Sequence, residues 1–361
     1  MPLLLRRTVR ACLRTVVSIC LLLGTGQAVL AAPPAQDFRL RVVGGLAGVS
    51  QYTLHEQRFW AEDLARLSQG RYSASIVPFD QAGVAAQDML NLVRLGVIPI
   101  GTVLLGHAAV ENPDLGMADM AGQSPDIASL RETVAALRPS MAQILHERFG
   151  ARLLGVYVYP AQILFCRQPI VHLAELAGRR VRVSGFSQAD FVQALGATPV
   201  FTEFADIVAH VRAGNAQCAV TGSMSGLALG LDRVTRSLFT MPISWGLAVS
   251  VVNEQSWDSF PPQLQELLGA QMPRLEAAIW DEAARETRDG IACNTGDGAC
   301  TRPRRGHLVA SVPTDADEAR RRDIFASHVL PGWMKRCGAG CVALWNRTLA
   351  ARTGVRAQEQ P

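Results

Sequence analysis

The sequence predicts an α/β protein of two domains that face each other across a ligand cleft. Two observations support this fold class. Strand-like and helix-like segments alternate in two successive β-α-β units, as in parallel sheets whose strands are joined by crossover helices. The chain of 361 residues is also longer than one hydrophobic core usually serves, and it suits two domains.

The first unit is predicted in the N-terminal part of the chain. Thr53 is expected to begin a helix, because Glu56 follows three positions later in a capping-box pattern and Gly70 can end the helix. Apolar periodicity predicts the remaining elements. We expect strands at 38–44, 72–79 and 97–105, and a second helix at 87–95.

The second unit follows a long amphipathic helix predicted at 127–149. Open α/β sheets bind ligands beyond the carboxyl ends of their strands, so two such units can form a cleft. We expect strands at 152–159, 162–166, 180–184, 198–201, 217–221, 247–252 and 307–312, and helices at 187–195, 204–213, 261–288 and from about 315 onward.

The first 31 residues have the layout of a secretory signal peptide. Arg6, Arg7, Arg10 and Arg14 precede an apolar run from Val16 to Leu30, and small residues follow. We expect cleavage after Ala31 and export to the periplasm. A membrane anchor is the alternative, but glycines interrupt the apolar run, and Cys20 lacks the sequence context of a lipoprotein.

The charge balance depends on this leader. The chain has 35 basic and 31 acidic residues, and removal of four leader arginines leaves a formally neutral protein. No basic run in the sequence argues for a nucleic-acid partner, and neutrality gives no reason to expect binding to a membrane surface.

Six cysteines remain beyond the leader, and an even number in an oxidising compartment predicts disulfides. The candidates are Cys166, Cys218, Cys293, Cys300, Cys337 and Cys341. Their pairing cannot be deduced from the sequence. A zinc site is the rival interpretation, but it lacks the usual C-x-x-C spacing, so we predict no metal and no cofactor.

Signatures of catalysis are incomplete. Gly222-Ser-Met-Ser-Gly226 has Met224 where a nucleophile elbow needs serine. His55-Glu56 and His146-Glu147 lack the second histidine of a zinc protease motif. Lys335 is the only lysine, which excludes a phosphate-binding P-loop. These features favour a binding protein over an enzyme.

One stretch resembles the DctP-type solute receptors of tripartite ATP-independent periplasmic (TRAP) transporters. The matching motifs are Leu176-Ala-Gly-Arg-Arg-Val-Arg182, Leu195-Gly-Ala-Thr-Pro199, Phe204-Ala-Asp206 and Ala213-Gly-Asn215. N-terminal segments from Phe59 to Glu62 and from Met89 to Gly96 agree as well. Two segments depart from the common pattern, at 156–162 and at 217–225.

The resemblance implies a two-domain periplasmic binding protein fold with a long helix spanning both domains. The implied boundaries are 37–154 plus about 246–290 for domain I, 155–245 plus about 300–353 for domain II, and a disordered tail at 354–361. It also implies a monomer that delivers its solute to membrane permease subunits. Alternative hypotheses are a secreted enzyme acting on a small acid and a periplasmic sensor or scaffold.

The resemblance further implies that Arg182 pairs with a ligand carboxylate, and a guanidinium suits this role because it binds a carboxylate with two parallel hydrogen bonds. Positions near expected strand ends give the other candidates, with Thr102 as a weaker one. These ligand-binding candidates are Gln162, Thr221, Gly222, Ser223, Trp245, Ser50, Gln51, Tyr52, Phe79 and Asp80.

Overall fold

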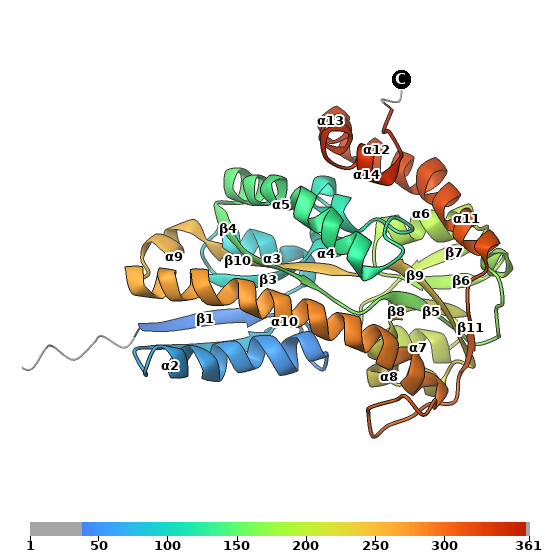
Figure 1. Ribbon diagram of the computed structural model, residues 1–361, viewed down its shortest axis with the longest axis horizontal. Coiled ribbons are helices and arrows are strands. Elements are labelled where there is room, and N and C mark those ends of the chain that lie inside the picture. The colour runs from blue at the N-terminus through green and yellow to red at the C-terminus, as the bar shows by residue number, and fades with distance from the viewer. Residues whose placement is uncertain (1–37, 359–361) are drawn as a thin grey trace, which may run out of the picture. The chain divides into compact units, whose positions relative to one another are not determined.

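The computed structural model describes residues 38–358 and contains two β-sheets surrounded by helices (Figure 1). The mixed α/β architecture confirms the predicted fold class. The predicted signal peptide, with its cleavage after Ala31, lies outside the described residues.

The first sheet has five strands in the order β2-β1-β3-β10-β4. Strand β1 pairs in parallel with β2 and β3, whereas β10 is antiparallel to both β3 and β4. Every residue of β10 is buried, as expected for a central strand covered on both faces. The strands span Phe38–Gly44 (β1), Tyr72–Pro78 (β2), Ile100–Leu104 (β3), Ala151–Val158 (β4) and Leu247–Asn253 (β10).

The second sheet has six strands in the order β11-β9-β5-β8-β6-β7. Strands β6, β7 and β8 are parallel, and β5 runs antiparallel to β8 and β9. The strands span Gln162–Cys166 (β5), Arg180–Val183 (β6), Thr198–Phe201 (β7), Cys218–Gly222 (β8), Ser237–Ser244 (β9) and Val309–Ser311 (β11).

Helices connect the strands and complete the C-terminal part. They span Leu64–Leu67 (α2), Met89–Arg94 (α3), Leu105–Ala108 (α4), Ile127–Phe149 (α5), Phe186–Ala194 (α6), Ile207–Arg212 (α7), Ser223–Leu229 (α8), Glu254–Asp258 (α9), Pro262–Thr295 (α10), Asp315–Ile324 (α11), Leu330–Cys337 (α12), Ala339–Thr348 (α13) and Ala350–Thr353 (α14). Short 3-10 and π turns lie at Gln51–Glu56 (η1), Phe59–Asp63 (η2), Ala86–Asp88 (η3), Pro113–Asp119 (η4), Leu173–Leu176 (η5), Leu231–Arg233 (η6) and Phe325–Val329 (η7).

Helix α10 is the longest helix described and packs on elements of both sheets (Figure 1). Near its middle, Trp280 donates from Nε1 to the carbonyl of Val156 in β4, at 2.8 Å. Near its end, Gly290 lies against α8, where a Cβ would come within 2.4 Å of the Met224 nitrogen. Glycine is therefore needed for this close approach of two helices.

Most predicted elements are confirmed, but strand β9 and the short helices α4, α8 and α9 were missed. Pro242 lies inside β9, and proline normally argues against a central strand. Here β5 and β9 lose regular register between Gln162 and Leu164, so the strand tolerates a residue without an N–H donor. Helix α10 extends beyond the predicted end at 288.

The predicted capping box at Thr53 is wrong. The helical segment already begins at Gln51, and the Thr53 hydroxyl donates back to the carbonyl of Val49 at 3.2 Å. The Glu56 carboxylate instead turns into the core, where it accepts from the Gly45 N–H at 2.9 Å and from the Thr102 hydroxyl.

The C-terminal segment also differs from the expected disordered tail. Trp345 in α13 donates to the carbonyl of Val355 at 2.9 Å, and Asn346 exchanges two hydrogen bonds with the backbone of Ala357. Ala357 is buried. This packing holds residues 355–357, and residues 359–361 lie outside the described part.

The six cysteines form three disulfides, which confirms them as disulfide residues. The pairs are Cys166–Cys218, Cys293–Cys300 and Cys337–Cys341. Cys166 and Cys218 lie opposite each other on adjacent strands β5 and β8. None of the helices among residues 38–358 combines the length and the apolar character needed to cross a membrane.

We predict that Cys166→Ala/Cys218→Ala lowers the free energy of unfolding by about 4 kcal/mol, because this disulfide closes a long loop in the unfolded chain. The paired residues are separated by 52 positions. Urea unfolding followed by circular dichroism measures the change. The control Cys337→Ala/Cys341→Ala opens a loop of separation 4 and should cost only about 2 kcal/mol. Equal losses in the two variants would contradict loop closure as the cause.

Glu56 should make stability pH-dependent. Burial raises the pKa of Glu56 to about 7, while hydrogen bonds from Thr102, Gly45 and Gln51 oppose the rise. The folded state therefore retains a proton that the unfolded chain releases, and stability should fall as pH rises from about 4 to about 7. Glu56→Gln should remove up to about 3 kcal/mol of this pH-dependent change.

Unfolding free energies measured between acid and neutral pH test this prediction. Glu62→Gln, at an exposed position six residues later, is the matched control and should keep the wild-type slope. An unchanged slope in Glu56→Gln would show that Glu56 is ionised in the folded protein across this range.

Candidate functional site

A cavity of about 470 Å³ lies where strand ends of the two sheets meet. The first sheet contributes the segments that follow β1, β2 and β3. The second sheet contributes residues of β5, β6, β8 and β9. The cavity thus occupies the carboxyl ends of the parallel strands, the position where open α/β sheets bind ligands.

Arg182, in strand β6, is the main charged group of this cavity. Its side chain is only 4% exposed. Nη1 donates to the carbonyl of Val220 at 2.9 Å, and Nη2 donates to the carbonyl of Thr202 at 2.8 Å. Nε donates to the Thr202 hydroxyl at 3.2 Å. A guanidinium has five N–H donors, so two remain for another acceptor.

The charge of Arg182 has no carboxylate partner within 4 Å among residues 38–358. Burial lowers the pKa of Arg182 to about 10, and the nearby charge of Glu203 opposes this shift. The guanidinium is therefore still charged at neutral pH. A buried cation of this kind is costly unless an anion compensates it.

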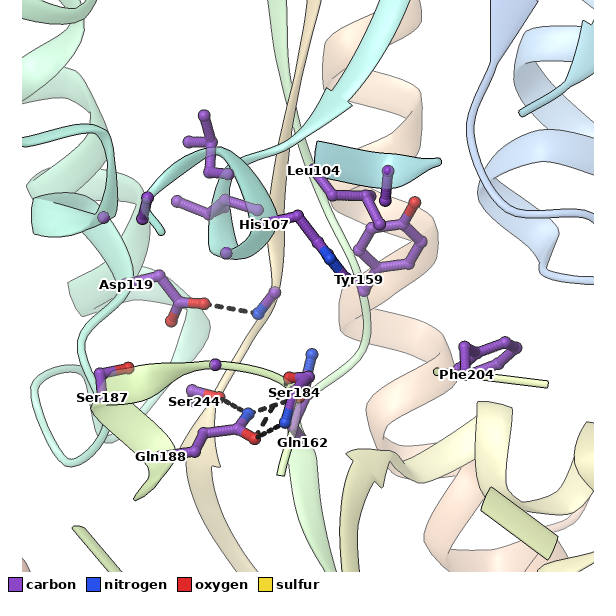
Figure 2. Close-up of a pocket in the computed structure, with 18 of the residues that line it drawn as sticks. Leu104, His107, Asp119, Tyr159, Gln162, Ser184, Ser187, Gln188, Phe204 and Ser244 are labelled. Atoms are coloured by element: carbon purple, nitrogen blue, oxygen red, sulfur yellow. Dashed lines mark hydrogen bonds between the residues drawn. The ribbon is translucent and has the colours of Figure 1, made fainter. Parts of the chain in front are cut away.

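A connected group of amides and hydroxyls lines another wall of the cavity (Figure 2). Gln188 in α6 donates from Nε2 to Gln162 Oε1 at 2.7 Å and to Ser244 Oγ at 2.8 Å. Its own oxygen accepts from the Ser184 N–H at 2.9 Å. These bonds use every strong donor and acceptor of Gln188, so its role is to orient Gln162 and Ser244.

His107 and Tyr159 lie on the side of the cavity formed by the first sheet (Figure 2). Burial lowers the pKa of His107, the charge of Glu203 opposes this, and Arg182 reinforces it. His107 is therefore neutral at neutral pH, and its ring can donate or accept one hydrogen bond. The Tyr159 side chain is buried.

Asp119 holds the chain where strand β9 leads into β10. Its two carboxylate oxygens accept from the backbone N–H groups of Trp245 at 2.9 Å and of Gly246 at 2.6 Å. Gly246 has φ of +79°, a left-handed conformation that favours glycine. Burial raises the pKa of Asp119 to about 7, and the two N–H donors oppose the rise.

Apolar side chains form the remaining walls. Phe79 and Leu104 come from the first sheet, Phe204 follows β7, and Trp333 lies on α12. Apolar walls with a few oriented polar groups are typical of small-molecule sites. The cavity thus combines one buried cation, one amide and hydroxyl group, and a neutral imidazole. This set can bind a small anion that carries a second polar group.

Six of the predicted site residues line the cavity. They are Arg182, Gln162, Thr221, Gly222, Phe79 and Asp80. The other five do not line it, and each makes a different contact. Ser223 donates to the carbonyls of Glu286 and Thr287 in α10. Ser50 donates to the Glu286 carboxylate.

The remaining three are core residues. Trp245 is 2% exposed and donates to the carbonyl of Ser124 at 3.1 Å. Gln51 is buried beside Gly45, and the Tyr52 ring packs against Gly44. Thr102 donates to Glu56. The sequence places these side chains next to strand ends, but helix rotation and side-chain direction turn them away from the cavity.

Sequence reasoning missed several lining residues with polar side chains. Among them are His107, Asp119, Tyr159, Ser184, Gln188 and Ser244. Ser244 was missed because strand β9 was missed. Gln188 could have been found, because its helix follows β6 directly and the first turn of such a helix faces the ligand region. His107 and Asp119 lie on short turns that no periodicity predicts.

The described residues contain no group of three or more histidine, cysteine or acidic side chains arranged to hold a metal. The cysteines considered for zinc are paired in disulfides.

A sequence model of the DctP family, described as bacterial extracellular solute-binding protein family 7, matches residues 46–293. No curated protein sequence matches the chain significantly.

Several solved structures share the fold. A Bordetella pertussis extracytoplasmic solute receptor that binds pyroglutamic acid is 17% identical, with 85% of this chain and 97% of that chain covered and a TM-score of 0.72. A Desulfovibrio salexigens TRAP solute-binding protein with orotic acid is 15% identical, with coverage of 87% and 99% and a TM-score of 0.75. A Rhodoferax ferrireducens TRAP protein with malonate is 18% identical, with coverage of 86% and 98% and a TM-score of 0.73.

These structures confirm the expected fold. The family consists of solute-binding receptors, which agrees with the prediction of a binding protein and not an enzyme. The resemblance drawn from the motifs between Leu176 and Asn215 is confirmed as well. Because the family match extends over most of the chain, this protein belongs to the DctP family of TRAP solute-binding proteins, bacterial extracellular solute-binding protein family 7.

Proposed function

We propose that this protein is an exported receptor that binds a small organic acid in the cavity between its two sheets and delivers it to TRAP membrane permease subunits. The ligand carboxylate accepts hydrogen bonds from Arg182. We further propose that the signal peptide ends at Ala31 and that the mature receptor works in the periplasm as a monomer.

One observation carries the proposal: Arg182 is buried and charged, yet it has no anionic partner within 4 Å in the described part of the chain. Its two remaining N–H groups, one on each terminal nitrogen, can donate to carboxylate oxygens. A carboxylate ligand would supply the missing negative charge in a region of low polarity, where such a pair is strong.

The ligands of similar structures support a small acid with a second polar group. Those structures contain pyroglutamic acid, orotic acid and malonate. In this protein, Gln162 and Ser244 are oriented by Gln188 and can serve the second polar group, since hydroxyl and amide groups both donate and accept. The cavity of about 470 Å³ is within the usual range for small-molecule sites.

We infer the two domains expected from the sequence, 37–154 plus about 246–290 and 155–245 plus about 300–353. The first crossing is shifted to 159–162, because β4 pairs in the first sheet as far as Val158. The pairing of β10 with β3 and β4 supports the return of the chain to the first sheet. A cavity between two such domains can close on its ligand by hinge motion.

We predict that Arg182→Ala weakens binding of the cognate acid by about 100-fold or more, because truncating a buried charge pair costs about 2–5 kcal/mol. Thermal shift can identify the acid from a panel that includes pyroglutamate, orotate and malonate. A true ligand at a hundredfold excess over Kd stabilises the protein by about 2.7 kcal/mol. Titration calorimetry then gives the affinity of each variant.

Arg180→Ala is the matched control for this experiment. Arg180 lies two positions earlier on the same strand and is exposed, and it donates to the backbone carbonyls of Asn215 and Gly214. It should bind the acid like wild type. Wild-type affinity in a folded Arg182→Ala variant would exclude Arg182 as the carboxylate site.

Gln188 should act as a positioning residue. We predict that Gln188→Ala weakens binding of an acid with a second polar group by about tenfold, because Gln162 and Ser244 lose their orienting bonds. Binding of a simple monocarboxylate such as propionate should change little. Gln193→Ala, at an exposed position of the same helix, is the control. An equal loss for both kinds of acid would indicate general damage to the cavity.

A further inference from the structure

A second concavity lies at the opposite end of the six-stranded sheet from the ligand cavity, with a volume of about 740 Å³. Strand β6 relates the two sites, because Arg182 near its carboxyl end lines the first and Arg179, just before its start, lines the second. The lining of this second concavity consists of Arg167, Gln168, Arg179, Arg212, Gln217, Arg233, Val234, Thr235 and Arg236.

Five of these nine residues are arginines and none is acidic. We call this set the arginine concavity. Its arginines come from separate points of the chain, so the sequence contains no basic run that would have revealed them. Folding thus gathers on one surface arginines that the sequence disperses.

The backbone beneath the arginine concavity is fixed. The Arg167 N–H donates to the carbonyl of Gln217 at 2.9 Å, and the Arg236 N–H donates to the carbonyl of Cys166 at 2.9 Å. The disulfide Cys166–Cys218 joins the same strands directly below. The segments that carry Arg167, Gln217 and Arg236 therefore have a fixed backbone. Less conformational entropy is then lost when an anion binds.

The side chains remain available for an anion. Arg167, Arg212, Arg233 and Arg236 are exposed, and within residues 38–358 no carboxylate comes within 4 Å of any of the five arginines. Arg179 is oriented by the backbone carbonyl of Gln168 at 2.9 Å. Like charges gathered around one concavity repel one another, and a bound anion would relieve the repulsion.

We propose that the arginine concavity is a second anion-binding site, which takes a compact multivalent anion with phosphoryl groups or closely spaced carboxylates. Guanidinium groups match both kinds of oxygen with paired hydrogen bonds. A single charge would gain little at an exposed site, where salt screens each contact. Several charges on one small ligand can engage several arginines together.

Titration calorimetry on the mature protein tests this site, with tripolyphosphate as the phosphoryl probe and citrate as the carboxylate probe. Wild type should bind at least one probe saturably at one site, and raising the ionic strength from about 0.02 M to about 0.15 M should weaken binding by about tenfold. A comparison of the two affinities shows whether the site prefers phosphoryl groups or carboxylates.

Three variants assign the binding. Arg212→Ala/Arg233→Ala should weaken binding of the probe by about tenfold or more. Arg39→Ala/Arg274→Ala removes the same formal charge at exposed positions elsewhere and should bind like wild type. Arg182→Ala should also bind the probe normally, which separates this site from the proposed carboxylate pocket.

Several outcomes would overturn the proposal. The first is that wild type binds neither probe saturably. The second is an equal loss of binding in the two double variants, which would indicate diffuse attraction over the surface. Binding to anionic phospholipid vesicles with no binding of either soluble probe would also overturn it, because it would assign the arginines to a membrane. Circular dichroism melts show whether each variant is folded. If a variant fails to fold, the salt dependence of probe binding by wild type still tests the proposal.

Discussion

The ligand cavity depends on one desolvated guanidinium. Arg182 is held by two peptide carbonyls, one from Val220 in β8 and one from Thr202 after β7. These neutral acceptors orient the side chain but do not cancel its charge. Burial of this cation therefore costs desolvation free energy. A bound anion offsets that cost, which is why the buried charge indicates an anion site. The same contacts fix the guanidinium before the ligand arrives, so little side-chain entropy is lost on binding.

Hydrogen bonds from helix α10 and from Asp119 fix the backbone where the chain crosses between the sheets next to the cavity. The chain passes between the sheets near residues 159–162 and 244–247. At the first crossing, the Ala161 N–H donates to Thr287 Oγ1 of α10 at 3.0 Å. At the second, Asp119 accepts from the backbone N–H groups of Trp245 and Gly246. Because Gln162 and Ser244 lie beside these crossings, the polar wall of the cavity is as well fixed as its cation.

The sequence predicts the regular part of this structure well. The α5 helix and most parallel strands follow from apolar periodicity, which reports the buried face of each element. Strand β9 escapes because Pro242 conflicts with the usual strand pattern. Several polar residues of the cavity were also not predicted from the sequence, for a different reason. Arg182 is marked by a motif, whereas His107 and Asp119 lie on short turns whose position is set by tertiary packing. The opposite error occurs at Trp245. Its position near a strand end suggests a ligand contact, but its side chain packs into the core.

Burial separates the two proposed anion sites physically. Arg182 lies in a cavity where the local dielectric is low, so one well-placed carboxylate gains a strong interaction that salt hardly screens. Arg212 and Arg233 face solvent, so each contact there is weak and affinity needs several charges at once. A monocarboxylate should therefore favour the cavity, and a multivalent anion that is too strongly hydrated to enter it should favour the arginine concavity. The same residue type can thus discriminate between two kinds of anion through its degree of exposure alone.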